Sequence, residues 1–302
     1  MSKKRKASTK PISRKEIEID LEKKPNDVIR FLGISLAGGK SDKACVALVE
    51  YYPKNKKIFL SRLFEKIKTE ERISADLKIH ELIEQNKDTL ACVAFDVPWR
   101  LPSCMTCVLN CPGYENCKEP HIKWMWDHFE QHGIKKKPKK IFTPYTQRAI
   151  EMHLANEMEE SFFMHHALGS NSAPLLARAH FIRRRLPESI NVIEVNPRLT
   201  LWRIGRTLDV MKSHLRHHRA AFGGDESRRL FLHAMNERDL TFIYHQDMKQ
   251  MIENSHAFDA FICALTGFLK YKNLTEKRPK DFPPYEDWIE FPRESVKPKD
   301  FE

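Results

Sequence analysis

Four cysteines lie close together along the chain, at Cys104, Cys107, Cys111 and Cys117, with the spacing C-x2-C-x3-C-x5-C. Clustered thiolates are typical ligands of tetrahedral zinc, and also of iron–sulfur clusters. The spacing therefore predicts a metal centre, with zinc favoured because the intervals are not those of a bacterial ferredoxin. Two alternatives stay open: His121 replaces one cysteine as a ligand, or the four thiols carry no metal.

Three carboxylates stand at places where a cation site could form. Asp96 and Glu194 each lie near the end of an apolar segment, and Asp259 lies inside the most apolar helical segment. Carboxylates that meet beyond the carboxyl ends of strands suit Mg²⁺ or Mn²⁺, and two such ions can drive phosphodiester hydrolysis. We therefore predict a catalytic acidic centre from these three residues. Each acid also has a structural alternative, as a turn-former before Pro98, as the partner of an arginine, or as a capping or solvent-facing helix residue.

The elements that must position these residues alternate between extended and helical patterns. Three apolar segments with short polar turns predict an antiparallel meander, and a helix and a buried central strand follow. The expected strands are Asp27–Ala37, Ala44–Tyr52, Lys57–Phe64, Leu90–Val97 and Ile190–Val195, with a short segment at Trp288–Phe291. The expected helices are 71–86, Ile122–Gln131, Tyr145–His166, further helices up to Glu253, and the apolar helix Ser255–Tyr271. The opening β-β-β-α-β order is that of the ribonuclease H-like fold. The fold class is thus α/β, a mixed sheet flanked by helices with a cysteine-rich metal-binding insertion.

The expected organisation is one domain with a basic arm in front of it. Residues 1–15 carry seven Lys or Arg and no acid, so 1–26 is predicted to be a disordered arm. The domain then covers 27–302, with a helical and cysteine-rich insertion at about 99–185. No apolar run approaches a membrane span or a secretory signal, which predicts a cytoplasmic protein without membrane attachment.

The charge favours a polyanionic partner. Lys and Arg number 52 against 41 Asp and Glu, a formal net charge of +11. Basic clusters stand at 135–140, 183–185 and 212–219, and Trp124 and Trp126 precede the first of them. Cations with aromatic rings suit backbone contact and base stacking, so nucleic acid is the expected partner, and no protein partner is indicated. Arg148 is expected near the acidic centre, where its guanidinium would bind a phosphate.

The chain resembles the domain-of-unknown-function 429 family, whose members are predicted nucleases of ribonuclease H-like fold. The resembling segments are Gly33–Gly38, Ala94–Pro98 with Leu101-Pro102, Pro144–Arg148 with Glu151, Ile193–Pro197, His256–Ala260 with Cys263–Thr266, and Trp288-Ile289 with Pro292. The resemblance implies that Asp96, Glu194 and Asp259 form the acidic centre. It also implies Gly-Ile-Asp on the first strand, where this chain has Ser35, and a hydroxyl is a much poorer Mg²⁺ ligand than a carboxylate.

Two main functions follow from these residues. The first is a Mg²⁺- or Mn²⁺-dependent nuclease, a hydrolase weakened by Ser35 in the substrate-binding centre. The alternative is a catalytically inactive nucleic-acid-binding protein with a structural zinc site. A third, an interaction protein whose basic charge serves solubility, predicts negligible binding to DNA and RNA.

Overall fold

The computed structural model describes residues 28–38, 42–133, 142–157, 164–169 and 171–302. The predicted basic arm, and the basic cluster at 135–140, lie outside these residues. Among the helices of the described part, none has the length and apolar character needed to cross a membrane.

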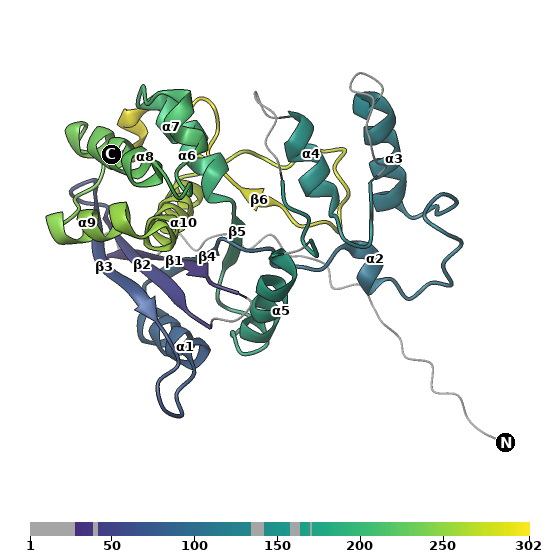
Figure 1. The fold of residues 1–302 in the computed structure, drawn as a ribbon, viewed down its shortest axis with the longest axis horizontal. Helices are drawn as coiled ribbons and strands as arrows, with labels where there is room; N and C mark the ends of the chain where they lie inside the picture. Colours follow the sequence, from purple (N-terminus) through teal and green to yellow (C-terminus); the bar gives the residue numbers. More distant parts are fainter. Residues whose placement is uncertain (1–27, 39–41, 134–141, 158–163, 170) are drawn as a thin grey trace.

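A six-stranded mixed sheet forms the centre of the protein (Figure 1), with the order β3-β2-β1-β4-β5-β6. The first three strands form the predicted antiparallel meander, and β4, β5 and β6 continue the sheet parallel to β1. The bounds are β1 Ile29–Leu36, β2 Ala44–Tyr52, β3 Lys57–Ile67, β4 Leu90–Phe95, β5 Val192–Val195 and β6 Ile289–Glu290. The predicted fold class is thus correct at the level of an α/β mixed sheet flanked by helices.

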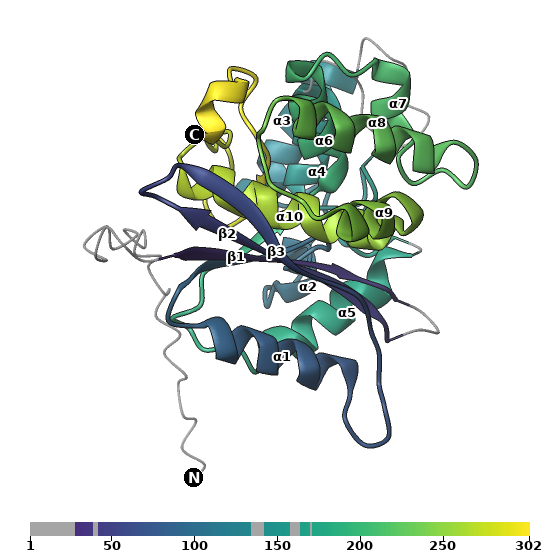
Figure 2. The ribbon, with the colours of Figure 1, turned by 90° about the vertical axis from the view of Figure 1, so that its left-hand side faces the viewer.

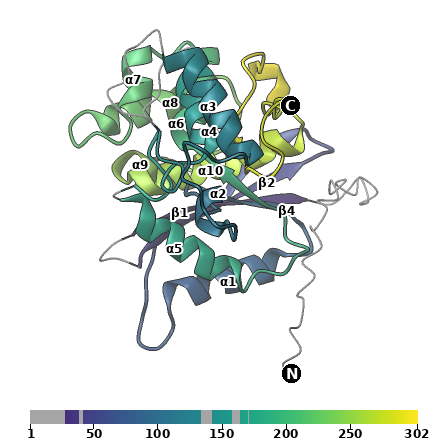
Figure 3. The ribbon, with the colours of Figure 1, turned by 90° about the vertical axis from the view of Figure 1, so that its right-hand side faces the viewer.

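Helices cover both faces of this sheet (Figure 2). One face packs against α1 and α5, and the other packs against α10 with further helices outside it. The bounds are α1 Ala75–Asn86, α2 Ser103–Thr106, α3 Pro120–Gly133, α4 Ala149–Glu157, α5 Ser172–Arg183, α6 Pro197–Thr207, α7 Lys212–Arg216, α8 Gly224–Glu237, α9 His245–Glu253 and α10 Ser255–Tyr271, with a 3-10 helix at Pro298–Phe301. Figure 3 shows the same layers from the opposite side.

Close packing of α10 on β1 depends on one glycine. A Cβ at Gly33 would lie 1.9 Å from the carbonyl oxygen of Ala260 and 2.4 Å from the backbone nitrogen of Ala264. A side chain at this position would therefore push the helix off the sheet. Two residues earlier on the same face, Phe31 meets Phe268 of α10 edge to face at 5.8 Å.

Two predicted helices begin later than expected. The first starts at Ala75 instead of 71, because the Ser74 side chain accepts from the backbone nitrogen of Leu77 and caps the helix there. The second was expected from Tyr145, but the chain first makes a turn in which the nitrogen of Thr146 donates to the carbonyl of Thr143. Helix α4 then covers Ala149–Glu157, and residues 164–166 are not helical.

Candidate functional site

Ser35 and Asp96 meet at the carboxyl ends of two neighbouring parallel strands. Ile34 of β1 lies opposite Phe95 of β4, so the next residue on each strand emerges on the other face of the sheet, toward α10. The Ser35 hydroxyl donates to Asp96 Oδ2 at 2.6 Å, and the backbone nitrogen of Leu36 donates to Oδ1 at 3.1 Å. The residue at the first-strand position is thus a hydrogen-bond donor to the acid that ends β4.

Asp259 joins this pair through an arginine that the sequence analysis placed in a basic cluster. Asp259 lies in α10 and is fully buried. The Nε of Arg219 donates to Asp259 Oδ2 at 2.6 Å, while its Nη2 donates to Asp96 Oδ2 at 3.2 Å. His218 Nε2 lies 3.0 Å from the other oxygen of Asp259. One guanidinium therefore bridges the two acids, at the place predicted for divalent ions.

The two acids differ in their electrostatics. Burial raises the pKa of Asp96 above its ordinary value, and the opposing charge of Arg219 does not cancel this effect. Burial also acts on Asp259, but Arg219 and His218 outweigh it and hold the pKa of Asp259 at about 2. Against the effect of burial, Asp259 and then Asp96 raise the pKa of Arg219 above its ordinary value. Asp259 is thus the carboxylate that chiefly balances the guanidinium.

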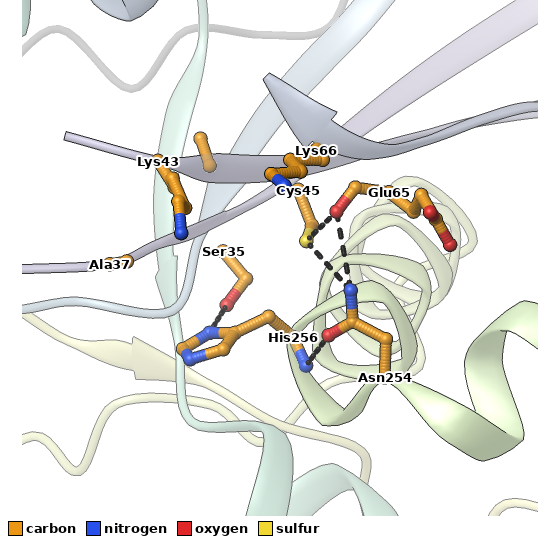
Figure 4. Close-up of a pocket in the computed structure, with 9 residues that line it drawn as sticks. Ser35, Ala37, Lys43, Cys45, Glu65, Lys66, Asn254 and His256 are labelled. Carbon is orange, nitrogen blue, oxygen red and sulfur yellow. Dashed lines mark hydrogen bonds between the residues drawn. The ribbon is translucent and has the colours of Figure 1, made fainter. Parts of the chain in front are cut away.

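A pocket of about 250 Å³ opens beside Ser35 (Figure 4). The Ser35 hydroxyl, which donates its one hydrogen to Asp96, also lies 2.9 Å from His256 Nδ1. In this second hydrogen bond the nitrogen is therefore the donor and the hydroxyl oxygen is the acceptor. The residues that line the pocket are Ser35, Ala37, Lys43, Ala44, Cys45, Glu65, Lys66, Asn254 and His256. Since a water molecule occupies about 30 Å³ in the liquid, this volume holds a phosphate group with several waters.

The floor of the pocket is the first turn of α10. Asn254 caps this helix, because its Oδ1 accepts from the backbone nitrogen of His256 at 3.0 Å. Its amide nitrogen donates to the carbonyl of Glu65 at 3.2 Å and so ties the helix start to β3. Burial, more than any other influence, raises the pKa of the Cys45 thiol to about 12, which excludes it as a nucleophile near neutral pH. The positive end of a long helix thus faces the pocket.

The rim of the pocket is held by Arg178 of α5. Its guanidinium donates to the carbonyls of Ala37 at 2.7 Å and Lys43 at 2.6 Å, and it forms an ion pair with Asp76 of α1. These bonds fix both ends of the connection from β1 to β2. Asp42, which follows the glycines of this connection, is exposed and bonds to Thr69 instead of turning toward Asp96.

The expected convergence of all three acids does not occur, because Glu194 points to the other face of the sheet. Glu194 lies opposite Phe95 in the β4–β5 register, and Phe95 packs in the core cluster on the α1 side. Glu194 accepts a two-pronged bond from Arg148 at 2.6 and 2.7 Å. Its Oε2 also accepts from the backbone nitrogen of Trp99 at 2.9 Å. Glu194 therefore belongs to a buried ion pair.

The same ion pair corrects the expectation for Arg148. Its Nε donates to Glu151 at 2.8 Å, and all three charged side chains are at least nine-tenths buried. Burial raises the pKa of Glu151 to about 7, against the lowering effect of Arg148. Arg148 faces two carboxylates instead of a phosphate, so its role in this structure is to neutralise buried acids.

The four clustered cysteines lie on one segment at the end of the molecule that carries α2 and α3 (Figure 1). Cys104 is in α2 and Cys107 directly follows it; Cys107 and Cys111 are exposed, and Cys104 and Cys117 are partly buried. Burial, and then the thiolates of Cys117, Cys107 and Cys111, raise the pKa of Cys104 to about 11. The four sulfur atoms are thus electrostatic neighbours. Within the described residues, no three His, Cys, Asp or Glu side chains are already arranged to hold a metal ion.

The residues around Asp96 and Asp259 do not form a donor set for Mg²⁺ or Mn²⁺. Hard cations of this kind take several oxygen ligands, mostly carboxylates. Here two carboxylates are available, the third position is the hydroxyl of Ser35, and the guanidinium of Arg219 occupies the space between the acids. The two carboxylates are instead paired with a cation that belongs to the protein, the guanidinium of Arg219.

Sequence reasoning missed the contribution of Arg219, His218 and His256. The first two belong to the basic stretch 212–219, whose composition favours a surface cluster for nucleic acid. One signal was available: an aspartate inside an apolar helix requires a counter-charge. Nothing in the spacing identifies which of many cations supplies it, because Arg219 is forty residues before Asp259.

Comparisons with known proteins add no family to this description. No family model matches the chain, and no match is found to a curated protein or to a solved structure. The resemblance to the domain-of-unknown-function 429 family therefore stays a prediction.

Proposed function

We propose that this protein is a nucleic-acid-binding protein of ribonuclease H-like fold that binds backbone phosphates in the pocket beside Ser35 without cleaving them. The observation that carries the proposal is the bridge of Arg219 between Asp96 and Asp259, at 3.2 and 2.6 Å. A guanidinium there balances the acids without divalent ions. The bridge supports binding over metal-dependent hydrolysis.

The order of elements supports the fold part of the proposal. The chain opens with β1, β2, β3, α1 and β4, and β4 returns to lie beside β1. This is the β-β-β-α-β opening that is typical of the ribonuclease H-like fold. The pocket also lies beyond the carboxyl end of β1, where open α/β sheets bind ligands.

The charges around the pocket support a phosphate ligand. Lys43 and Lys66 line it and are exposed, and the first turn of α10 adds a partial positive charge. Of the described residues that line the pocket, Glu65 is the one with an acidic side chain. A phosphate would therefore meet more positive than negative charge.

An exposed aromatic side chain close in sequence to Arg219 supports a nucleic acid over a small phosphate compound. Phe222 is 95% exposed and lies three residues after Arg219, in the connection between α7 and α8. Bases stack on exposed rings with a gain of about 1–3 kcal/mol each. A ring that is 95% exposed makes little packing contact with the described part of the domain. Basic residues precede it at 212–219.

The test is a binding titration of the full chain with labelled single-stranded DNA and RNA of the same sequence. We expect binding that weakens as salt increases, because phosphate contacts release counterions. Replacing Lys43 and Lys66 together by alanine should weaken binding to both polymers and lower the salt slope by about one to two. Lys249→Ala is the matched control, because Lys249 is exposed on α9 in a pair with Glu253. Binding that is absent at low salt, or unchanged in the double variant, would refute the proposal.

Metal-dependent cleavage is the second candidate, and the proximity of Asp96 and Asp259 favours it. It requires Arg219 to leave the acids, which its 46% exposed side chain permits sterically. Incubation with labelled DNA, RNA and hybrid in Mg²⁺ or Mn²⁺ decides between the two. Cleavage that Asp96→Asn and Asp259→Asn both abolish would replace our proposal, and intact substrate with salt-dependent binding supports it.

A further inference from the structure

The segment 103–119, which follows β4, is attached to the rest of the domain at its two ends but not in its middle. At the first end, Ser103 bonds to the buried Glu286, and Arg100 pairs with Asp287 at 3.0 Å. At the second end, the ring of Tyr114 stacks on Trp126 of α3 with 6.0 Å between the ring centroids. The backbone carbonyl of Tyr114 also accepts from the Trp126 ring nitrogen at 3.0 Å. These contacts attach the two ends of the segment to the domain.

The middle of the segment has no regular structure of its own. Residues 107–119 form neither helix nor strand, and between described residues no backbone hydrogen bond involves 108–111. Val108 is 95% exposed and Leu109 57% exposed, so apolar packing does not stabilise this part either. The stretch is long beside the usual connections of about 4–6 residues, and the longest loops of compact domains are mostly functional loops or linkers.

The four clustered cysteines divide between the held and the unheld parts. Cys104 and Cys117 pack against the main core from the two ends, while Cys107 and Cys111 are exposed on the part between them. Pro112 and Gly113, the latter with φ of +85°, turn the chain back between Cys111 and Cys117. The segment therefore carries two sulfur atoms near its ends and two in its middle, with a turn of the chain before Cys117.

We propose that Cys104, Cys107, Cys111 and Cys117 bind one structural zinc ion that closes the segment 103–119. The proposal does not depend on the function proposed above. Cys107 and Cys111 must turn inward to complete a tetrahedron, and no backbone bond of the described residues between them resists this rotation. Zinc replaces the thiol protons, so up to four protons pass to solvent when it binds. Four protein ligands leave no open position, which makes the site structural and not catalytic.

The exposure of Cys107 and Cys111 makes the test sharp. Serine at either position leaves the packed core untouched, so a loss of metal reports on ligation instead of on folding. Cys45→Ser is the matched control, since Cys45 is distant in sequence and a hydroxyl there can keep its bond to the carbonyl of Glu65. The proteins are purified under reducing conditions, and bound zinc and iron are measured by mass spectrometry, before and after incubation with zinc chloride. Circular dichroism confirms that each variant is folded.

We expect one zinc per chain in the parent protein and in Cys45→Ser. In Cys107→Ser and Cys111→Ser, the zinc content should fall by roughly tenfold or more. Cobalt in place of zinc should give the visible absorption of a tetrahedral thiolate site in the parent, and neither Cys107→Ser nor Cys111→Ser should show this absorption. Three results would overturn the proposal: no zinc in the parent after incubation with zinc chloride, zinc retained by both cluster variants, or iron with acid-labile sulfide, which would assign an iron–sulfur cluster.

Discussion

Removing the Arg219 side chain is the most direct way to test how the acidic centre is held together. In Arg219→Ala, Asp259 and Asp96 stay buried while the guanidinium that bridges them is lost. Breaking a buried ion pair by removing one partner costs about 3–5 kcal/mol, because a charge is left without compensation. The side chain of Arg219 is 46% exposed, so solvent screens part of the interaction. We therefore expect the free energy of unfolding to fall by about 2 kcal/mol.

The assay is urea unfolding at pH 7, followed by circular dichroism and tryptophan fluorescence. A loss of about 2 kcal/mol corresponds to a decrease in Tm of about 4–8 °C for a domain of this size. Arg229→Ala is the matched control, because Arg229 forms an exposed pair with Glu226 on α8 and should change stability by less than about 0.5 kcal/mol. Mg²⁺ or Mn²⁺ at millimolar concentration should stabilise Arg219→Ala more than the parent, since the vacated carboxylates can then bind the cation.

Two outcomes would refute this reasoning. If Arg219→Ala unfolds at the same urea concentration as the parent, the bridge does not compensate the buried acids. If Asp259→Asn destabilises the Arg219→Ala protein as much as it does the parent, the two residues are not energetically coupled.

Three further predictions concern the packing and the charges of the domain. Gly33→Ala should destabilise the domain by about 3 kcal/mol or more in urea, because its Cβ would collide with the Ala260 carbonyl at 1.9 Å; unchanged stability would contradict the packing of α10 on β1. Arg148→Met should cost about 3–5 kcal/mol by leaving the buried Glu194 without a counter-charge, and reduced nucleic-acid affinity at full stability would show that Arg148 binds phosphate after all. Asp259, whose pKa falls from its ordinary 3.8 to about 2, contributes stability that is complete above pH 4 and is lost as pH falls toward 2. The loss over this range, roughly 2 kcal/mol, should be absent in Asp259→Asn when unfolding is measured at several pH values.

The scaffold was predictable because its strongest signals are local. Strand β2 and helix α10 have the predicted bounds, since both are apolar runs closed by polar or turn residues. The starts of α1 and α4 were missed for a local reason as well. A side chain at Ser74 and a turn at Thr143 decide where those helices begin, and neither changes the apolar periodicity.

The acidic centre was predictable only in part because it depends on the face to which each strand residue points. A strand alternates its side chains between two faces, so a difference of one residue in register decides whether an acid joins a site. Asp96 follows Phe95 and emerges toward α10, whereas Glu194 lies opposite Phe95 and emerges toward α1. A sequence shows that both acids lie at strand ends, but it does not show the register between β4 and β5.

Ser35 and Arg219 explain each other through the charge of the site. The family resemblance implies an aspartate on the first strand, and three acids at one point would require divalent ions to balance them. With Ser35 in that place, two acids remain, and burial raises the pKa of Asp96, so Asp259 is the one that stays ionised at low pH. A single guanidinium then supplies enough positive charge for the centre, and Arg219 donates hydrogen bonds to both acids. A carboxylate at position 35 would reverse this balance. Ser35→Asp should therefore make the protein less stable without divalent ions and should make its stability dependent on them.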